Sequence, residues 1–207
     1  MYFEPAFWEQ RYVEHPELFD WYVQLPIFYE HIKPKLTKDD RILILGAGTS
    51  RLPFQLFDLG YHDITCIDFA EGARRGVEKE LQTREGIRYV VQDARTMNLT
   101  GQEGHFTIVI EKGMLDCVLT NTFEPLTAAK EVINNVKRFL TPHATWFSLS
   151  FDGTDRKEIL EYCTTYTFIV SDPYKIVPPA LDPVPAVMPI FYLYKLEYAI
   201  IAPPEDD

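Results

Sequence analysis

Two glycines separated by one alanine, Gly46-Ala47-Gly48, follow a short apolar run in this chain of 207 residues. The run Arg41–Leu45 has no polar alternation, which predicts a strand buried on both faces of a parallel sheet. Glycines at the end of such a strand let the chain turn sharply and let a ligand approach the backbone. Arg51 stands at the third glycine position of the dinucleotide fingerprint, so half of that fingerprint is present. The loop indicates a nucleotide-type ligand, with a simple tight turn as the alternative.

Acidic residues stand at the ends of the next two expected strands. Asp68 lies twenty residues after Gly48, where an acid accepts hydrogen bonds from ribose hydroxyls. Asp93 ends the following strand, where an exocyclic amine could donate to its carboxylate or to backbone carbonyls nearby. Because parallel strands end at one edge of a sheet, an adenosine would span three strand ends. Alternatively, Asp68 caps the helix that begins near Glu71.

A third polar group ends the fourth expected strand. The sequence there is Glu111-Lys112-Gly113-Met114-Leu115-Asp116. Two carboxylates and a lysine would thus lie beside the same crevice, at the edge where this architecture binds its ligands. A solvated turn is the alternative interpretation.

Other catalytic and metal-binding patterns do not occur in the sequence. A GxSxG elbow and a GxxxxGK[ST] loop are both missing, so hydrolase and P-loop functions have no support. No histidine has a partner at metal-ligand spacing, and we predict no metal site. The histidines, interpreted as surface or packing residues, are His15, His31, His62, His105 and His143. The cysteines, which form no CxxC pair and fit a reducing compartment, are Cys66, Cys117 and Cys163.

The chain is acidic, with 20 Lys and Arg against 31 Asp and Glu and a formal charge of −11. This charge repels phosphate backbones and anionic lipid, which disfavours nucleic acid and membranes as partners and favours a basic protein. No apolar run approaches the roughly 18 to 20 residues that span a bilayer, and no charged-then-apolar leader follows Met1. We therefore expect the protein to lie in the cytoplasm. A monomer is expected as well.

Strands and helices alternate along the middle of the chain, which predicts an α/β fold of βαβ units around a mainly parallel sheet. The expected strands are Arg41–Leu45, 63–67, Ile87–Val91, 106–110, 145–151, 164–170 and 190–201. The expected helices are one capped by Thr49 and Ser50 and ended by Gly60, then 71–82, 124–140 and one that begins at Asp155. Pro142 is expected to end the helix at 124–140.

The rest of the chain is expected to belong to the same single domain, residues 1–207. Residues 1–40 are rich in aromatic side chains and are predicted to form an N-terminal helical cap, either as part of the core or as a lid over a ligand. The core is expected at 41–201 and a frayed tail at 202–207. Six prolines within residues 172–189 exclude helix and central strand there and predict a long loop.

The segments RILILGAGTSRL, ITCIDFA, VVQDAR and FTIVIEKGMLDCVL resemble the class I, seven-β-strand S-adenosylmethionine-dependent methyltransferases across nearly the whole chain. More specific are EKGMLD at 111–116, FWEQRY at 7–12 and FDWY at 19–22. These segments are similar to the branch that contains the methyltransferase 13-like enzymes and the lysine methyltransferases of elongation factor 1-alpha and citrate synthase. The sequence departs from that branch at Met114, where threonine is usual.

The resemblance implies a Rossmann-like, mostly parallel sheet of seven strands with the last antiparallel, helices on both faces, and S-adenosylmethionine across the carboxyl edge. The glycine loop would then approach the methionine moiety and Asp68 the ribose. Asp93 with Ala94 would approach the adenine, and Glu111 would lie near the methyl group. The cofactor-binding residues that the resemblance implies are Trp8, Arg11, Tyr12, Gly46, Ala47, Gly48, Asp68, Phe69, Asp93, Ala94 and Glu111.

The resemblance further implies methyl transfer to a lysine of a protein, with elongation factor 1-alpha as the favoured partner. Glu111 or Asp116 could act catalytically by holding and orienting the ammonium group, although a nearby carboxylate raises a lysine pKa. Aromatic rings at Trp21, Tyr22 or Tyr192 could instead stabilise the cationic amine through their faces. The sequence leaves these possibilities open.

Two other functions fit the same sequence. One is methyl transfer to a small molecule, and the other is nucleotide binding without catalysis by a protein of the same fold. Long loops in compact domains are commonly functional, so we expect the loop at 172–189 to form one wall of the acceptor groove.

Overall fold

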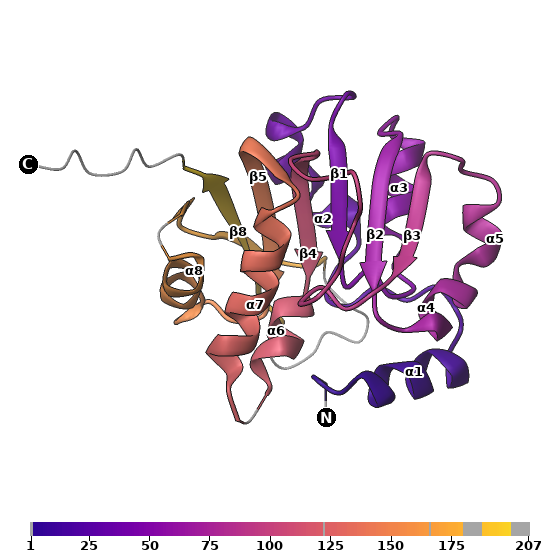
Figure 1. The fold of residues 1–207 in the computed structure, drawn as a ribbon, viewed down its shortest axis with the longest axis horizontal. Helices are drawn as coiled ribbons and strands as arrows, with labels where there is room; N and C mark the ends of the chain where they lie inside the picture. Colours follow the sequence, from indigo (N-terminus) through magenta and orange to yellow (C-terminus); the bar gives the residue numbers. More distant parts are fainter. Residues whose placement is uncertain (1, 122, 166, 180–187, 200–207) are drawn as a thin grey trace, which may run out of the picture.

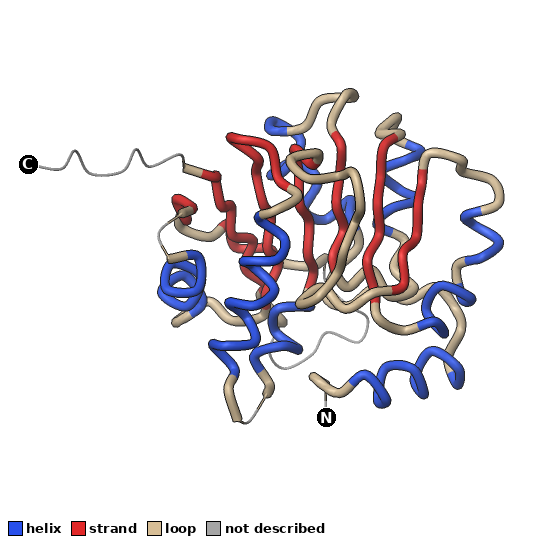
Figure 2. The backbone as a smooth tube through the Cα atoms, viewed as in Figure 1, coloured by secondary structure: helices blue, strands red, loops and turns tan. Residues whose placement is uncertain are grey.

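The computed structural model describes residues 2–121, 123–165, 167–179 and 188–199. Its strands form one central sheet surrounded by helices (Figure 1 and Figure 2). The strands are β1 (Arg41–Leu45), β2 (Asp63–Asp68), β3 (Ile87–Val91), β4 (Phe106–Lys112), β5 (Leu140–Ser150), β6 (Phe168–Val170), β7 (Tyr174–Ile176) and β8 (Phe191–Tyr198). The predicted α/β, Rossmann-like fold class is confirmed.

The helices are short, and most of them follow a strand as expected for βαβ units. They are α1 (Pro5–Glu14), α2 (Leu25–Ile32), the 3-10 turn η1 (Lys33–Lys35), α3 (Leu52–Asp58), α4 (Glu71–Gly76), α5 (Glu78–Leu81), α6 (Met114–Leu119), α7 (Pro125–Lys137) and α8 (Arg156–Thr164). No described helix is long and apolar enough to cross a membrane.

The strand order is β3-β2-β1-β4-β5-β8-β6. The strands from β3 to β5 pair in parallel, whereas β8 runs antiparallel to β5, β6 and β7. Seven strands follow one another across the sheet, as predicted, and the last in sequence is antiparallel. The described residues add an eighth strand, β7, which pairs with β8 off this path. β7 lies within residues 172–189, so the predicted loop is partly a strand.

Apolar side chains of the strands build a core on each face of the sheet. Because side chains alternate along a strand, Leu43 and Leu45 pack with α7 and α8, while Ile42 and Ile44 pack with α2 and α3. The expected apolar stripe of α7 is buried at Ala129, Val132, Ile133 and Val136. The continuous apolar pattern of β1 is thereby explained, since both of its faces are covered.

Two expected helices differ in the structure. The helix predicted at 71–82 is divided into α4 and α5 at Val77, after the weak helix former Gly76. The helix predicted at 124–140 ends at Lys137, and Pro142 lies in β5 instead of ending it. The pairing of β4 with β5 shifts register after Phe106, so Pro142 falls in an irregularity where a strand tolerates proline.

The predicted N-terminal cap divides into two parts. α2 packs on one face of the sheet as part of the core, with Phe28 and Ile32 buried. α1 lies beyond the carboxyl ends of the parallel strands, beside α4 (Figure 1). In the N-terminal segment, α2 therefore belongs to the core, whereas α1 lies at the edge of the sheet where the parallel strands end.

Candidate active site

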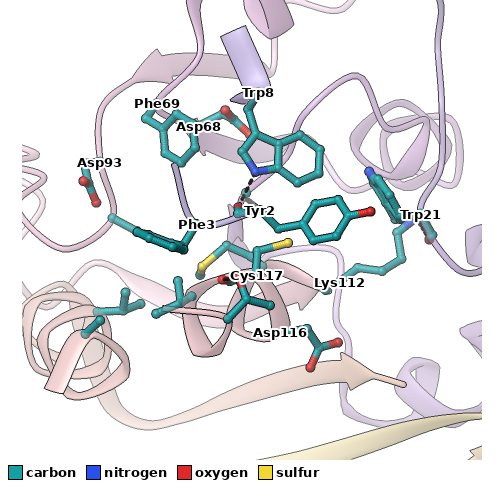
Figure 3. Close-up of a pocket in the computed structure, with 18 of the residues that line it drawn as sticks. Tyr2, Phe3, Trp8, Trp21, Asp68, Phe69, Asp93, Lys112, Asp116 and Cys117 are labelled. Atoms are coloured by element: carbon teal, nitrogen blue, oxygen red, sulfur yellow. Dashed lines mark hydrogen bonds between the residues drawn. The ribbon is translucent and has the colours of Figure 1, made fainter. Parts of the chain in front are cut away.

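A cavity of about 310 Å³ opens at the carboxyl ends of β1, β2 and β4. This is the edge at which parallel α/β sheets bind ligands, and the volume is at the lower end of that of small-molecule sites. In Figure 3, Asp68, Phe69 and Trp8 lie on one side of the cavity, and Cys117 and Asp116 lie on the other. The cavity thus collects residues from segments that are far apart in the sequence.

The glycine loop turns as its sequence predicts. Gly46 and Gly48 have φ of +60° and +52°, a conformation that disfavours residues with a side chain. A Cβ on Gly46 would lie 2.6 Å from the side chain of Met114, and a Cβ on Gly48 would lie 2.4 Å from Tyr12 Oη. Gly46 lines the cavity, whereas Ala47 and Gly48 line a smaller adjoining pocket. The loop has no space for larger residues.

Asp68 lies in the wall of the cavity at the end of β2. Its Oδ2 accepts a hydrogen bond from Gly48 N and its Oδ1 accepts one from Ala70 N, both at 2.9 Å. Burial raises the pKa of this carboxyl to about 6, against the opposing effect of the two backbone donors. Asp68 therefore supports the glycine loop and begins the turn toward α4, while each oxygen keeps capacity for a further donor.

The next strand end supplies a second, mainly apolar part of the cavity. Phe69 and Ala94 line it together with Val118, Ala128 and Val132 from α6 and α7. Asp93 also lines it, but both of its oxygens accept hydrogen bonds from Arg95. Burial would raise the pKa of Asp93, but the bonds from Arg95 outweigh this and lower it. This end can hold a flat apolar ring beside an ionised carboxylate.

Aromatic residues of α1 close another side. Trp8 and Tyr12 are buried, stack at a centroid distance of 5.7 Å, and line the cavity. The Glu9 carboxylate accepts hydrogen bonds from Gly72 N at 3.0 and 3.1 Å, at the start of α4. The Arg11 guanidinium lies over the Phe19 ring at 5.0 Å, outside the cavity wall. α1 therefore forms a wall of the site and is bonded to α4 through Glu9, while Arg11 packs on Phe19 on the side of α1 away from the cavity.

Lys112 fastens a second N-terminal segment across the site. Its ammonium donates to Asp20 Oδ1 at 2.9 Å and to the carbonyl oxygens of Trp21 and Val23 at 2.7 and 3.0 Å. Burial lowers the pKa of Lys112, while Asp20 opposes that change. Its partners lie about ninety positions earlier in the chain, so the sequence around Lys112 gives no sign of this role.

Glu111 is 1% exposed and faces α6. Its Oε2 accepts hydrogen bonds from the backbone N–H groups of Met114 and Leu115, and its Oε1 accepts one from Ser148 Oγ. Burial and the nearby charge of Asp116 raise the pKa of Glu111 to about 7. The structure places Glu111 behind the cavity wall, where it positions the start of α6.

Replacing Glu111 with glutamine should change how stability depends on pH. Because the pKa of Glu111 is raised from 4.5 to about 7 on folding, the unfolding free energy of the parent should fall as pH rises through that window. The shift corresponds to about 3 kcal/mol. Glutamine carries no charge to bury, so Glu111→Gln should be more stable than the parent at pH 8 and nearly equal to it at pH 4.

Urea unfolding of parent and variant at both pH values measures this effect. Glu158→Gln, on the exposed face of α8, is the control and should follow the parent at both. An unfolding free energy of Glu111→Gln that falls between pH 4 and pH 8 as steeply as that of the parent would contradict the assignment.

Asp116 lies at the far side of the cavity and is 6% exposed. Its Oδ1 accepts hydrogen bonds from Ser150 Oγ at 2.7 Å and from Arg156 Nη2, and its Oδ2 accepts one from Tyr22 Oη at 2.6 Å. The ion pair with Arg156 is buried on both sides. Within the described residues, no group of three or more histidines, cysteines and carboxylates is placed to hold a metal ion.

Several lining residues were not predicted. Tyr2 and Phe3 line the cavity, and Figure 3 shows their rings between its two sides. A ligand here would contact these rings or displace them. The smaller pocket contains Trp21 Nε1 and Thr49 Oγ1, buried polar atoms without a hydrogen-bond partner among the described residues. The sequence signal for Tyr2 and Phe3 was the aromatic richness of the N-terminal segment, whereas Trp21 was expected as a possible partner of the amine and Thr49 as a helix cap.

Some predicted residues lie elsewhere. Tyr192 packs over Gly153, where an added Cβ would lie 2.1 Å from its ring, and it is not among the residues that line the cavity. The loop predicted at 172–189 contributes β7 to the sheet, and residues 180–187 lie outside the described part of the chain. Its expected place beside the acceptor groove therefore remains a prediction.

Comparison with known proteins gives matches over much of the chain. The family described as "Methyltransferase domain" matches residues 43–147. EEF1A lysine methyltransferase 4 of Bos taurus is 30% identical over 158 residues, which are 72% of this chain and 61% of that protein. The eEF1A lysine and N-terminal methyltransferase of Mus musculus is 34% identical over 57% of this chain and 17% of that protein. The chain spans about three fifths of the length of the first relative.

Solved structures share the fold. A Burkholderia thailandensis 1,6-didemethyltoxoflavin-N1-methyltransferase, with bound 1,6-didemethyltoxoflavin and S-adenosylhomocysteine, has a TM-score of 0.70 at 15% identity over 94% of this chain and 86% of that one. A SAM-dependent methyltransferase of Methanosarcina mazei has a TM-score of 0.66 at 15% identity over 82% of this chain and 97% of that one. At such identities the similarity concerns the fold.

Proposed function

The chain belongs to the methyltransferase-domain family, and we propose that it transfers a methyl group from S-adenosylmethionine to a lysine side chain of a protein. The observation that carries the proposal is one cavity with a buried carboxylate at a strand end, Asp68, and an aromatic and acidic part formed by Tyr22, Phe151 and Asp116. The first part suits a ribose and the second suits an amine. The relatives named as lysine methyltransferases of EEF1A support the same acceptor.

The residues present fit this cofactor. The apolar part around Phe69 and Ala94 would hold the adenine, and Asp68 would accept hydrogen bonds from the ribose hydroxyls. The unpartnered Trp21 Nε1 and Thr49 Oγ1 suit a polar group such as the carboxylate of the methionine part. When bound, the cofactor supplies an activated methyl group: the acceptor nitrogen forms the new N–C bond, the electron pair of the C–S bond stays on sulfur, and a proton leaves to water.

The surroundings of the cavity suit a basic partner. The chain has a net charge of −11, which attracts a lysine-bearing protein at long range. Phe151 lines the cavity and is 60% exposed, so its ring is accessible to a protein surface. We assign elongation factor 1-alpha as the favoured partner, with Glu111 and Asp116 positioning the acceptor part of the cavity.

The remaining features of the proposal concern the cell and the assembly. We propose that the protein acts in the cytoplasm as a monomer, without nucleic acid or membrane as a partner, and that residues 172–189 contribute to acceptor binding. The acidic charge of the chain supports the choice of partner class.

Calorimetry with S-adenosylmethionine and with NADH tests the cofactor assignment. The full chain should bind S-adenosylmethionine and should not bind NADH at the same concentrations, because the third glycine position of the dinucleotide fingerprint holds Arg51. Binding of NADH without binding of S-adenosylmethionine would contradict the proposed function.

A further inference from the structure

The carboxylate of Asp116 is saturated by groups of the protein itself. Its two oxygens accept from Tyr22 Oη, Ser150 Oγ, Arg156 Nη2 and the backbone N–H of Phe151, the last at 3.3 Å. A carboxylate offers about four lone-pair sites, so none is left for an acceptor amine. Asp116 therefore orients its neighbours, and another group must receive the amine.

Tyr22 is the neighbour of Asp116 that combines an oxygen with lone pairs and a place in the cavity wall. Its hydroxyl proton is committed to Asp116 at 2.6 Å, which leaves the phenol oxygen free to accept. The ring stacks on Phe191 at 4.8 Å, and a Cβ on Gly113 would lie 3.0 Å from it. Tyr22 is thus fixed by contacts on two sides and by one hydrogen bond.

The backbone of Tyr22 is also strained. Its φ is +64°, a left-handed conformation that is rare and unfavourable for a bulky residue. The ammonium of Lys112 holds this turn by donating hydrogen bonds to the carbonyl oxygens of Trp21 and Val23. A strained residue held by buried contacts is a common feature of functional sites.

We propose that the phenol oxygen of Tyr22 accepts a hydrogen bond from the N–H of the acceptor lysine and so directs the nitrogen lone pair for methyl transfer. The inference rests on the proposed function and deepens it. Asp116 is a positioning residue that fixes the hydroxyl proton of Tyr22, and Arg156 is a positioning residue that fixes Asp116.

The charges around this group suit an amine that must be neutral to react. A lone carboxylate would raise the pKa of the lysine, whereas the paired Asp116 and Arg156 carry no net charge. The other titratable groups that face this pair are Glu111 of β4, Cys117 of α6, Asp152 after β5, Cys163 of α8 and Tyr194 of β8. The phenol of Tyr22 and the paired Asp116 and Arg156 therefore add no net charge of their own beside the amine.

Tyr22→Phe tests the inference, because it removes the oxygen and keeps the ring. With recombinant elongation factor 1-alpha free of lysine methylation as acceptor, kcat should fall about 100- to 1,000-fold, as on loss of one preorganised hydrogen bond at a reacting group. The dissociation constant of S-adenosylmethionine should stay within about twofold of the parent value, since Asp68 and the glycine loop are unchanged. Tyr29→Phe, which removes a 3.1 Å contact with Tyr61 outside the cavity, is the control.

A second variant tests the charge argument. Asp116→Asn leaves the charge of Arg156 without its partner, so the acid limb of the pH–kcat profile should move to lower pH. Parental kcat in Tyr22→Phe would overturn the inference, as would a parallel loss of cofactor affinity in that variant or an unmoved acid limb in Asp116→Asn. If the parent itself modifies no lysine, the proposed function fails as well, so the two failures are distinguishable.

Discussion

Asp68→Ala is expected to weaken S-adenosylmethionine binding about 30- to 1,000-fold, or about 2 to 4 kcal/mol, because two charge-assisted hydrogen bonds to the ribose are lost. The same change removes the acceptor of Gly48 N and loosens the glycine loop. With a raised pKa of about 6, Asp68 takes up a proton below that pH. The affinity of the parent for the cofactor should therefore fall as pH drops below about 6.

Calorimetry on both proteins measures the effect. Asp63→Ala is the matched control, because Asp63 begins the same strand and lies outside the cavity. Its carboxylate forms a partly exposed ion pair with Arg88, with 3.3 Å between the charged atoms. The control should bind the cofactor as the parent does. If Asp68→Ala retained the parental dissociation constant, Asp68 would be a structural cap of the following turn and not a ligand of the ribose.

Arg156→Met is expected to lower the unfolding free energy by about 3 to 5 kcal/mol, because it leaves the buried carboxylate of Asp116 without its cation. For a chain of this length the loss corresponds to roughly 6 to 20 °C in Tm.

Thermal unfolding of the neighbouring variant Lys157→Met provides the control. Lys157 pairs with Asp172 on the surface, and such exposed pairs contribute little to stability, so its Tm should remain close to that of the parent. Equal Tm values for Arg156→Met and Lys157→Met would show that the buried pair is not coupled to folding.

Local sequence patterns predicted most of the fold. The apolar runs at Arg41–Leu45 and Ile87–Val91 form strands with the predicted bounds, because burial on a sheet leaves a pattern in neighbouring residues. α6 was missed, since a helix of six residues that follows Gly113 gives almost no periodicity. β7 was missed because its three residues are held by pairing with β8, and nothing in its own sequence indicates that contact.

In the site, too, features with a local sequence pattern were predicted and features that depend on distant residues were not. The glycine loop and Asp68 were predicted from their spacing, and the structure brings them together at one cavity. The partner of Asp116 was not predictable, because Arg156 lies forty positions away on α8. Glu111 or Asp116 was expected, as one of two possibilities, to hold the acceptor ammonium, and in the structure each carboxylate accepts hydrogen bonds from several groups of the protein. Hydrogen-bond saturation is a property of the fold and has no local signature in the sequence.

Mass spectrometry of elongation factor 1-alpha after incubation with the full chain and S-adenosylmethionine tests the central claim most directly. The acceptor is recombinant protein free of lysine methylation, and a reaction with Asp68→Ala serves as the control. The proposed function predicts methyl groups on lysine with the parent and a much lower yield with the variant at limiting cofactor. Cofactor binding by the parent without methylation of any lysine would contradict it.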